Sequence, residues 1–232
     1  MTQFFWGSAD TILYFLICAS AALLLRFLIR IPDEIFRKLL HTILLGSLPV
    51  YVFAFDTWYY ASASALVFAA VVFPILWAFE HIRGFSKTVT ERRPGELKAS
   101  LLLVFSMFAA VIAVFWGIFG DRLLVLAAVY AWGPGDAAAA LIGKRFGRHH
   151  FPNSKKSIEG SAAMLCVSAV TVCVILLLRG GLSVGACLLT ATVTGAVCAA
   201  VELYTPGGYD TVSCPAAAAA VLLPMLSAFG GL

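Results

Sequence analysis

The stretch that decides how this chain folds runs from residue 132 to residue 161 and reads WGPGDAAAALIGKRFGRHHFPNSKKSIEGS. One acid, Asp136, lies inside an otherwise apolar segment; a basic loop with glycines follows it, and a new apolar segment opens at Ser157. A carboxylate at membrane depth costs about 2.5–3.5 kcal/mol on insertion scales, so it rarely stands there without a partner or a function. We interpret the stretch as a phosphate and metal site at the edge of a bilayer.

The composition of the whole chain is that of a membrane protein. Of its 232 residues, 62% are hydrophobic and 12% are charged. Ordinary soluble domains have about 45–50% apolar and about 25% charged residues. The net charge of +4 indicates no nucleic-acid partner. The six cysteines lie in or beside apolar runs without a CxxC pair, which favours small buried side chains over disulfides or metal ligands. Homo-oligomerisation is left open.

Eight apolar windows are long enough to cross the hydrocarbon core of a bilayer, for which about 20 residues are needed. They lie near residues 10–30, 37–55, 58–79, 97–119, 123–142, 158–178, 182–201 and 212–229. The fifth window is interrupted by Gly133, Pro134 and Gly135, a break that is tolerated where the backbone lines a protein cavity. We predict an all-α, polytopic transmembrane helical bundle of about eight spans, with residues 1–232 forming a single integral membrane domain.

The charges predict the orientation of these spans. With the N-terminus outside, every Lys and Arg except Arg122 and Arg179 falls on the cytoplasmic side, where such residues are enriched. All four histidines fall there as well, and among the acids only Asp10, Asp56 and Asp121 lie outside. We therefore expect the active site on the cytoplasmic face.

Two of the connections on this side are long. Residues 80–96 are interpreted as a lid or interfacial helix, although a charged face resting on anionic headgroups explains them equally well. Residues 143–157 are interpreted as a nucleotide-binding loop.

The first group of residues that could carry chemistry follows Pro32, with Asp33 predicted as a helix N-cap. Four polar residues then share one helical face at i, i+3, i+4 and i+7: Glu34, Arg37, Lys38 and His41. A basic collar that sets topology would explain the two cations. It does not explain why an acid and a histidine share their face, so we assign Arg37 and Lys38 to a triphosphate.

The second group lies in the opening stretch. Asp136, Ala140, Gly143 and Gly147 fall on one helical face, where small residues let another backbone or phosphate oxygens come close. A carboxylate suits Mg²⁺, which usually takes one or two carboxylates together with substrate phosphates. The charge that a nucleotide triphosphate needs would come from the basic residues that follow, namely Lys144, Arg145, Arg148, Lys155 and Lys156.

The end of this stretch predicts the start of the next helix. Ser157 is a suitable N-cap, and the N–H groups behind it, up to Gly160, could bind an anion. Glu159 either matches the helix dipole or belongs to the site, and the surrounding cations favour the site. His149 and His150 are interpreted as loop residues. No GxxxxGK[ST] pattern is present, which argues against a P-loop enzyme.

The third group is VELYTPGGYD, residues 201–210. Its Thr-Pro-Gly-Gly run predicts a turn between the last two spans. Glu202 and Asp210 would then lie at the cytoplasmic surface, where either could complete the metal shell or accept a proton. Capping of helix ends is the alternative for both acids.

At these residues the chain resembles the polyprenol kinase family, which includes dolichol kinase, phytol kinase and CTP-dependent diacylglycerol kinases. The resemblance covers most of residues 34–215. It is carried by Glu34, Arg37, Lys38 and His41, by the run from Gly135 to Gly143 with Phe146 and Gly147, by Lys156 to Ser161, and more weakly by Asp210, Thr211 and Pro215. The last run lacks the Asn and Leu that are usual in the family.

The resemblance implies a membrane lipid kinase that uses CTP as phosphoryl donor. Arg37, Lys38, Asp136 and Gly143 are the positions to which the family's roles carry over first. We expect Asp136 to bind Mg²⁺, with Asp210, Glu202 or His41 orienting or deprotonating the hydroxyl of a lipid alcohol. In this interpretation the acid and the cations from separate spans converge on one triphosphate.

Two other functions are weighed against this one. Phosphatidate cytidylyltransferase has a similar Asp–Gly–Gly–Lys block and uses the same nucleotide, but its C-terminal pattern has no counterpart after Leu182. A transporter or passive scaffold is the third possibility. Transporters usually bind at the bilayer midplane between repeated halves, whereas the ionisable groups here gather on one side.

Overall fold

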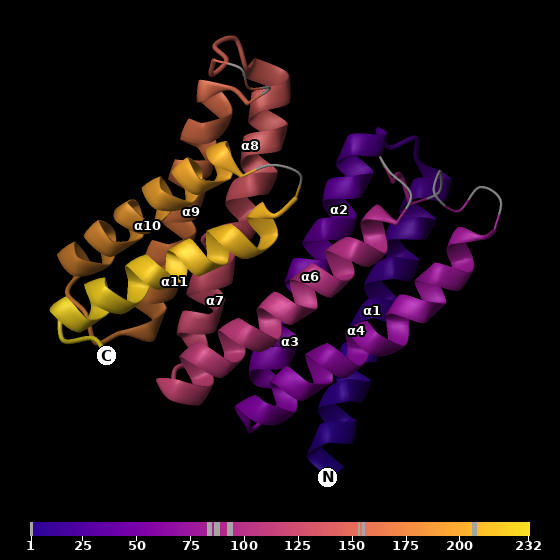
Figure 1. The fold of residues 1–232 in the computed structure, drawn as a ribbon, viewed down its shortest axis with the longest axis horizontal. Coiled ribbons are helices and arrows are strands. Elements are labelled where there is room, and N and C mark those ends of the chain that lie inside the picture. Colours follow the sequence, from indigo (N-terminus) through magenta and orange to yellow (C-terminus); the bar gives the residue numbers. More distant parts are fainter. Residues whose placement is uncertain are drawn as a thin grey trace. The chain divides into compact units, whose positions relative to one another are not determined.

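The computed structural model describes residues 2–82, 85, 89–91, 95–152, 154, 156–205 and 208–232. In this part of the chain all regular elements are helices (Figure 1). The chain divides into two compact units, Met1–Gly117 and Ile118–Leu232, and each is described by itself. We call them the N-terminal unit and the C-terminal unit. The prediction of a single membrane domain stays a prediction.

The N-terminal unit begins with the long helix α1 and ends in a π-helical segment. Its described helices are α1 (Thr2–Leu28), α2 (Asp33–Gly46), α3 (Leu48–Phe53), α4 (Trp58–Glu80) and α6 (Glu96–Val111), which continues as the π-helix Ile112–Ile118. Helices α4 and α6 pack along one another, and α1 contacts α2, α3 and α4.

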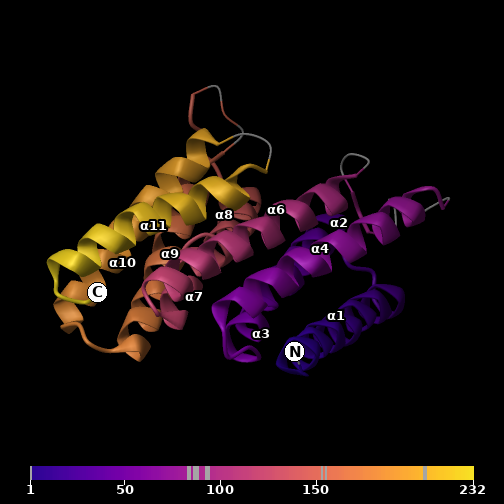
Figure 2. The ribbon, with the colours of Figure 1, turned by 60° about the horizontal axis from the view of Figure 1, so that its bottom comes forward.

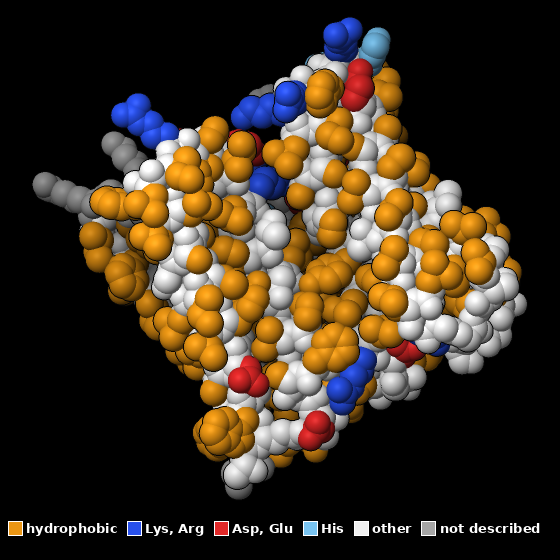
Figure 3. Space-filling model, turned by 180° about the vertical axis from the view of Figure 1, so that it is seen from behind, with side chains coloured by type: hydrophobic (Ala, Val, Ile, Leu, Met, Phe, Trp, Pro, Cys, Tyr) orange, Lys and Arg blue, Asp and Glu red, His pale blue; other side chains and the backbone are white. Residues whose placement is uncertain are grey.

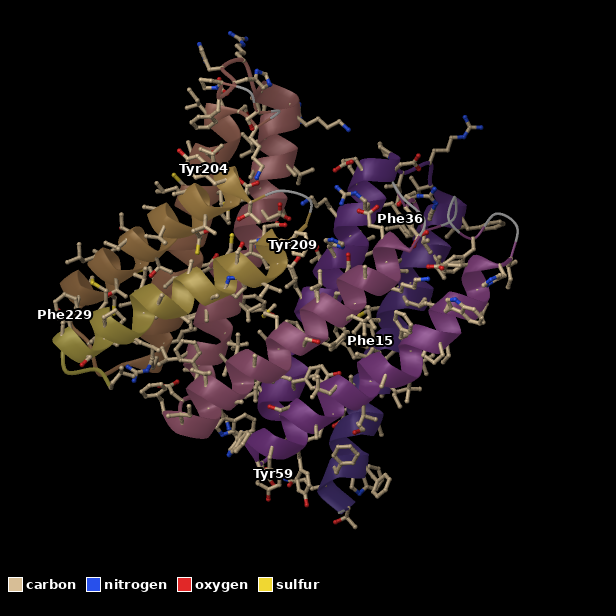
Figure 4. All side chains as sticks on the ribbon, viewed as in Figure 1. Phe15, Phe36, Tyr59, Tyr204, Tyr209 and Phe229 are labelled. Carbon is tan, nitrogen blue, oxygen red and sulfur yellow. The ribbon has the colours of Figure 1, made fainter. Side chains whose placement is uncertain are left out.

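Aromatic rings form the core of the N-terminal unit. Phe105 of α6 is fully buried, and its ring lies 5.0 Å from that of Phe68 and 5.6 Å from that of Phe108. Phe15 of α1 stacks on Phe68 with ring centroids 4.7 Å apart (Figure 4). Tyr51 of α3 lies 5.9 Å from Phe105. Each ring buries a large apolar area, so this cluster fixes α1, α3, α4 and α6 together.

The C-terminal unit is built around α9. Its helices are α7 (Arg122–Tyr130), α8 (Gly133–Phe146), α9 (Ile158–Arg179), α10 (Val184–Tyr204) and α11 (Asp210–Ala228). Helix α9 packs against α7, α8 and α10, and α11 packs against α10 and α7. Figure 2 shows α10 and α11 running side by side.

Small residues let the helices of the C-terminal unit approach closely. At Gly195 of α10 a Cβ atom would lie 2.8 Å from the carbonyl oxygen of Leu165 and 3.0 Å from the nitrogen of Ala169, both in the backbone of α9. Real Cβ atoms do not come this close to backbone atoms, so the α9–α10 crossing requires glycine at this position.

Eight segments are long and apolar enough to cross a membrane, as judged by length and composition over the described residues. They correspond one to one to the predicted windows, and three of them combine two elements: α2 with α3, α6 with the π-helix, and α7 with α8. Hydrophobic side chains cover the flanks of the helices, while charged side chains gather towards helix ends (Figure 3). This confirms the all-α fold with eight segments that could cross a membrane, and their orientation stays a prediction.

The fifth segment is broken, as the sequence indicated, but slightly earlier. Helix α7 ends at Tyr130, and α8 begins at Gly133 with Pro134 in its first turn. Proline is compatible with this position because the first N–H groups of a helix have no intrahelical partner. The interruption therefore lies at Ala131 and Trp132, immediately before the glycines.

Candidate functional site

Asp136 lies half-buried in the first turn of α8. Its backbone N–H donates to the carbonyl oxygen of Trp132 at 2.8 Å, which is the bond that starts the helix. The first turn of a helix carries a partial positive charge, so a carboxylate is stabilised there. The break between α7 and α8 thus explains locally why an acid is accommodated in this apolar segment.

Trp132 also contacts the second candidate acid. Its indole Nε1–H donates to Oδ2 of Asp210 at 3.0 Å, and the side chain is only 2% exposed. Asp210 is the first residue of α11, and Tyr209 before it occupies the N-cap without a side-chain capping bond. Asp210 is therefore not the N-cap of α11, and its carboxylate accepts from an indole that lies just before α8.

Sequence reasoning did not assign Trp132 a role, although a signal was available. A tryptophan N–H that becomes buried usually finds an acceptor. Trp132 stands next to a helix break and four residues before an acid, so its need for a partner could have been anticipated. The identity of that partner could not have been anticipated, because Asp210 lies far from Trp132 along the chain.

Three of the predicted nucleotide-binding glycines meet at the crossing of α8 and α9. A Cβ atom at Gly160 would lie 2.9 Å from the carbonyl oxygen of Ala139, and one at Gly143 would lie 3.0 Å from Oγ of Ser157. At Gly147 it would lie 2.8 Å from the same hydroxyl. The sequence left open whether a backbone or phosphate oxygens use this space. The Ser157 side chain lies against Gly143 and Gly147, and the backbone of α8 lies against Gly160, while phosphate binding at these glycines stays a prediction.

Ser157 is the N-cap of α9, as predicted. Its Oγ accepts from the N–H of Gly160 at 3.1 Å, while the N–H of Ile158 donates to the carbonyl of His149 at 2.8 Å. Two N–H groups at this helix start are therefore bonded within the protein. An anion would have to use the remaining polarity of the terminus rather than these two groups.

Glu159 in the first turn of α9 binds the preceding basic loop, residues 143–157, through His149. Its carboxylate accepts from the backbone N–H of His149 at 3.2 Å and lies 2.8 Å from the ring Nδ1 of that histidine. An isolated antiparallel bridge between His150 and Ser157 closes the loop from the other side. The contact between Glu159 and His149 accounts for Glu159 structurally, and its predicted role in nucleotide binding stays untested.

Lys156 connects this loop to the end of α10. Its Nζ lies 2.8 Å from Oε1 of Glu202, donates to the carbonyl oxygen of Glu202 and lies 3.4 Å from that of Thr205. Glu202 is only 9% exposed. Cations stabilise a helix C-terminus by binding its last carbonyls. The two side chains neutralise one another, and Tyr204 and Tyr209 mark the adjoining helix ends in Figure 4.

The remaining predicted cations of the loop have different positions. Lys144 is exposed in the last turn of α8, where its charge complements the helix dipole. Lys155 lies outside the described residues. The predicted lid at 80–96 also falls partly outside them. Its first residue, Glu80, binds Nζ of Lys98 in α6 through Oε2 at 2.5 Å, which connects α4 to α6.

The residues predicted on α2 belong to the N-terminal unit. Arg37 binds Glu34 at 2.5 Å, and its other terminal nitrogen lies 3.7 Å from Glu96 of α6. Lys38 is buried and His41 is half-buried. Asp33 is the first helical residue rather than the N-cap, and its carboxylate binds Arg26 at 3.0 Å. The predicted N-cap is wrong because Pro32 takes that position.

The described residues contain no group of three or more His, Cys, Asp or Glu side chains able to hold a metal ion. Mg²⁺ does not require such a group, because it usually binds through one or two carboxylates and completes its shell with waters and substrate phosphates. Asp136 and Asp210 would supply that number of carboxylates; Trp132 accepts from the backbone N–H of the first and donates to the carboxylate of the second.

Comparison of the chain with known protein families, with curated proteins and with solved structures found no match. The class that the chain itself defines is a multi-pass helical membrane protein. Any narrower function has to be argued from its residues.

Proposed function

We propose that the protein is a membrane lipid kinase that transfers a phosphoryl group from CTP to a lipid alcohol such as a polyprenol, a phytol-like isoprenoid or diacylglycerol. The choice of donor and acceptor comes from the resemblance to polyprenol kinases. The observation that best supports the proposal is the pair of hydrogen bonds at Trp132, one to the Asp136 backbone and one to the Asp210 carboxylate.

In the proposed reaction the lipid hydroxyl oxygen bonds to the γ-phosphorus of CTP while the bond from that phosphorus to the β,γ-bridging oxygen breaks. CDP leaves, and the hydroxyl proton passes to a carboxylate, for which we assign Asp210, and then to water. Asp136 would hold Mg²⁺, which when bound offsets the negative charge of the phosphates. Glu202 is the weaker metal candidate, because its carboxylate is paired with Lys156.

The proposal includes an orientation with the N-terminus outside and the loop 143–157 in the cytoplasm, which rests on the distribution of Lys and Arg. The acceptor would enter sideways from the inner leaflet while its chain stays among the helices. Cysteine labelling with a membrane-impermeant reagent tests the orientation. A cysteine at exposed Lys144 should react only from the cytoplasmic side.

The decisive experiment uses purified protein, Mg²⁺, a panel of lipid alcohols and CTP labelled either in the γ-phosphate or in the cytidine ring. Label from the γ-phosphate on a lipid supports the kinase. Ring label appearing on phosphatidate would instead establish a cytidylyltransferase. Transfer of neither label, with lipid or nucleotide carried across vesicles unchanged, would establish a transporter.

Asp136→Asn tests the proposed metal ligand. We expect turnover to fall by about 10²- to 10³-fold, because loss of one preorganised electrostatic group at a reacting centre commonly costs this much. Asp10→Asn, an exposed acid in α1, is the control and should keep full activity. Full turnover in Asp136→Asn would remove Asp136 from the site.

A further inference from the structure

Trp132 occupies the joint between α7 and α8, and its backbone is bonded to both helices. Its N–H donates to the carbonyl of Val129 in α7 at 3.1 Å, and its carbonyl accepts from the N–H of Asp136 in α8 at 2.8 Å. With the side chain 2% exposed, the indole is enclosed by protein. The position of this residue is therefore set by the helix that carries Asp136.

The indole connects this joint to a third helix, α11, through its hydrogen bond to Asp210. An indole N–H can only donate, and the Oδ2 atom of Asp210 accepts from it at 3.0 Å. Asp210 is the first residue of α11, so the bond from the indole ties its carboxylate to the start of α8.

We propose that Trp132 is a positioning residue, which fixes the Asp210 carboxylate relative to Asp136 for phosphoryl transfer. This inference rests on the proposed function and deepens it. Trp132 does not touch the substrate; it acts through Asp210. A carboxylate that accepts the hydroxyl proton must be held at hydrogen-bonding distance from the acceptor, and small displacements of such groups cost much of the rate.

The test is a double-mutant cycle on Trp132→Phe and Asp210→Asn in the full-length protein. Phenylalanine keeps a buried ring and removes the N–H. We expect Trp132→Phe to lower kcat about 10- to 100-fold with the KM for CTP unchanged. In the Asp210→Asn background it should add less than about twofold, because residues acting as one unit are not additive. Trp116→Phe, a buried tryptophan of the N-terminal unit, is the control and should keep its kcat.

A kcat of Trp132→Phe equal to the wild type, or effects that multiply in the double variant, would overturn the positioning role. A structural role alone would lower the melting temperature and the yield without the dependence on Asp210.

A second measurement separates this inference from the proposed function. The ¹⁵N-indole resonance of Trp132, identified by its loss in Trp132→Phe, should shift in Asp210→Asn and stay in place in Asp10→Asn. An unshifted resonance would overturn the bond itself. A wild-type protein that transfers no phosphoryl group to any alcohol while the resonance does shift would overturn the proposed function and leave the bond established.

Discussion

The N-terminal unit is packed by aromatic rings, whereas the C-terminal unit is packed by small residues that bring helix backbones together. In the first, Phe15, Phe68, Phe105 and their neighbours fill the space between helices. In the second, α9 contacts its neighbours at glycines where even a Cβ would collide with backbone, as at Gly160 and Gly195. Large side chains hold the helices of the N-terminal unit together, and close backbone contacts hold those of the C-terminal unit together.

The difference matters for where chemistry could be placed. Rings can adjust their rotamers when a neighbour changes, but two backbones in contact cannot move apart without shifting a whole helix. The seam of α8 and α9 therefore holds Asp136 and Ser157 on a rigid support. Preorganised groups at rigid positions are what phosphoryl transfer requires.

The largest expected effect comes from removing the central ring of the aromatic unit. Phe105→Ala should lower the free energy of unfolding by about 3–5 kcal/mol, because it leaves a cavity among four aromatic partners. Chemical unfolding in detergent micelles measures it. Phe27→Ala, whose ring is 88% exposed, is the control and should change little. Equal effects of the two substitutions would contradict an aromatic core.

The next prediction addresses the glycine seam. Gly195→Ala should lower stability by about 1–3 kcal/mol through overpacking against the α9 backbone. Gly185→Ala is a matched control in the same helix, because a Cβ there meets nothing within 4 Å in the described part of the chain. Alanine raises helix propensity by up to about 1 kcal/mol at either position, so the control should be neutral or stabilising. Thermal unfolding measures the stability of both variants. A Gly195→Ala variant more stable than the wild type would disprove the close contact between Gly195 and the backbone of α9.

An effect of similar size compares the ionic connections of the two units. Lys156→Met should cost about 1.5–3 kcal/mol, because Nζ binds one carboxylate oxygen and backbone carbonyls at the end of α10. Lys98→Met removes a pair with Glu80 and a contact over the Phe73 ring and should cost less. The midpoints of chemical unfolding show which of the two substitutions lowers stability more. The reverse order would show that Lys156 contributes little to the folded state and would favour its predicted role in nucleotide binding.

The smallest effect tests the cap of α9. Ser157→Ala should cost about 1 kcal/mol, the usual value for losing an N-cap hydroxyl. Ser183→Ala removes the corresponding cap of α10, where Oγ accepts from the N–H of Ala186 at 3.2 Å. Because Ser157 also lies against Gly143 and Gly147, its loss should affect phosphoryl transfer while the loss of Ser183 does not. Assays of both variants at matched stability distinguish the two roles.

The fold followed from the sequence to the extent that it depends on local properties. Long apolar runs predicted all eight candidate spans, and Ser157 was recognised as a cap, because hydropathy and capping act over a few residues. The predicted N-cap at Asp33 was wrong, because Pro32 takes that position and the Asp33 carboxylate binds Arg26. A local pattern cannot reveal a competing partner such as Arg26 or Trp132, which another element supplies.

By itself, then, the amino-acid sequence determined a chain of membrane-spanning helices broken near Gly133, with its ionisable residues concentrated in a few short stretches. Only the tertiary structure decided which residues contact one another. Trp132 binds Asp210, Lys156 binds Glu202, and Gly195 lies against the backbone of α9. Hydrophobicity is summed along the chain and can be calculated from composition. A hydrogen bond or a backbone contact is a pairing in space, and helix packing brings together residues that are far apart in the chain.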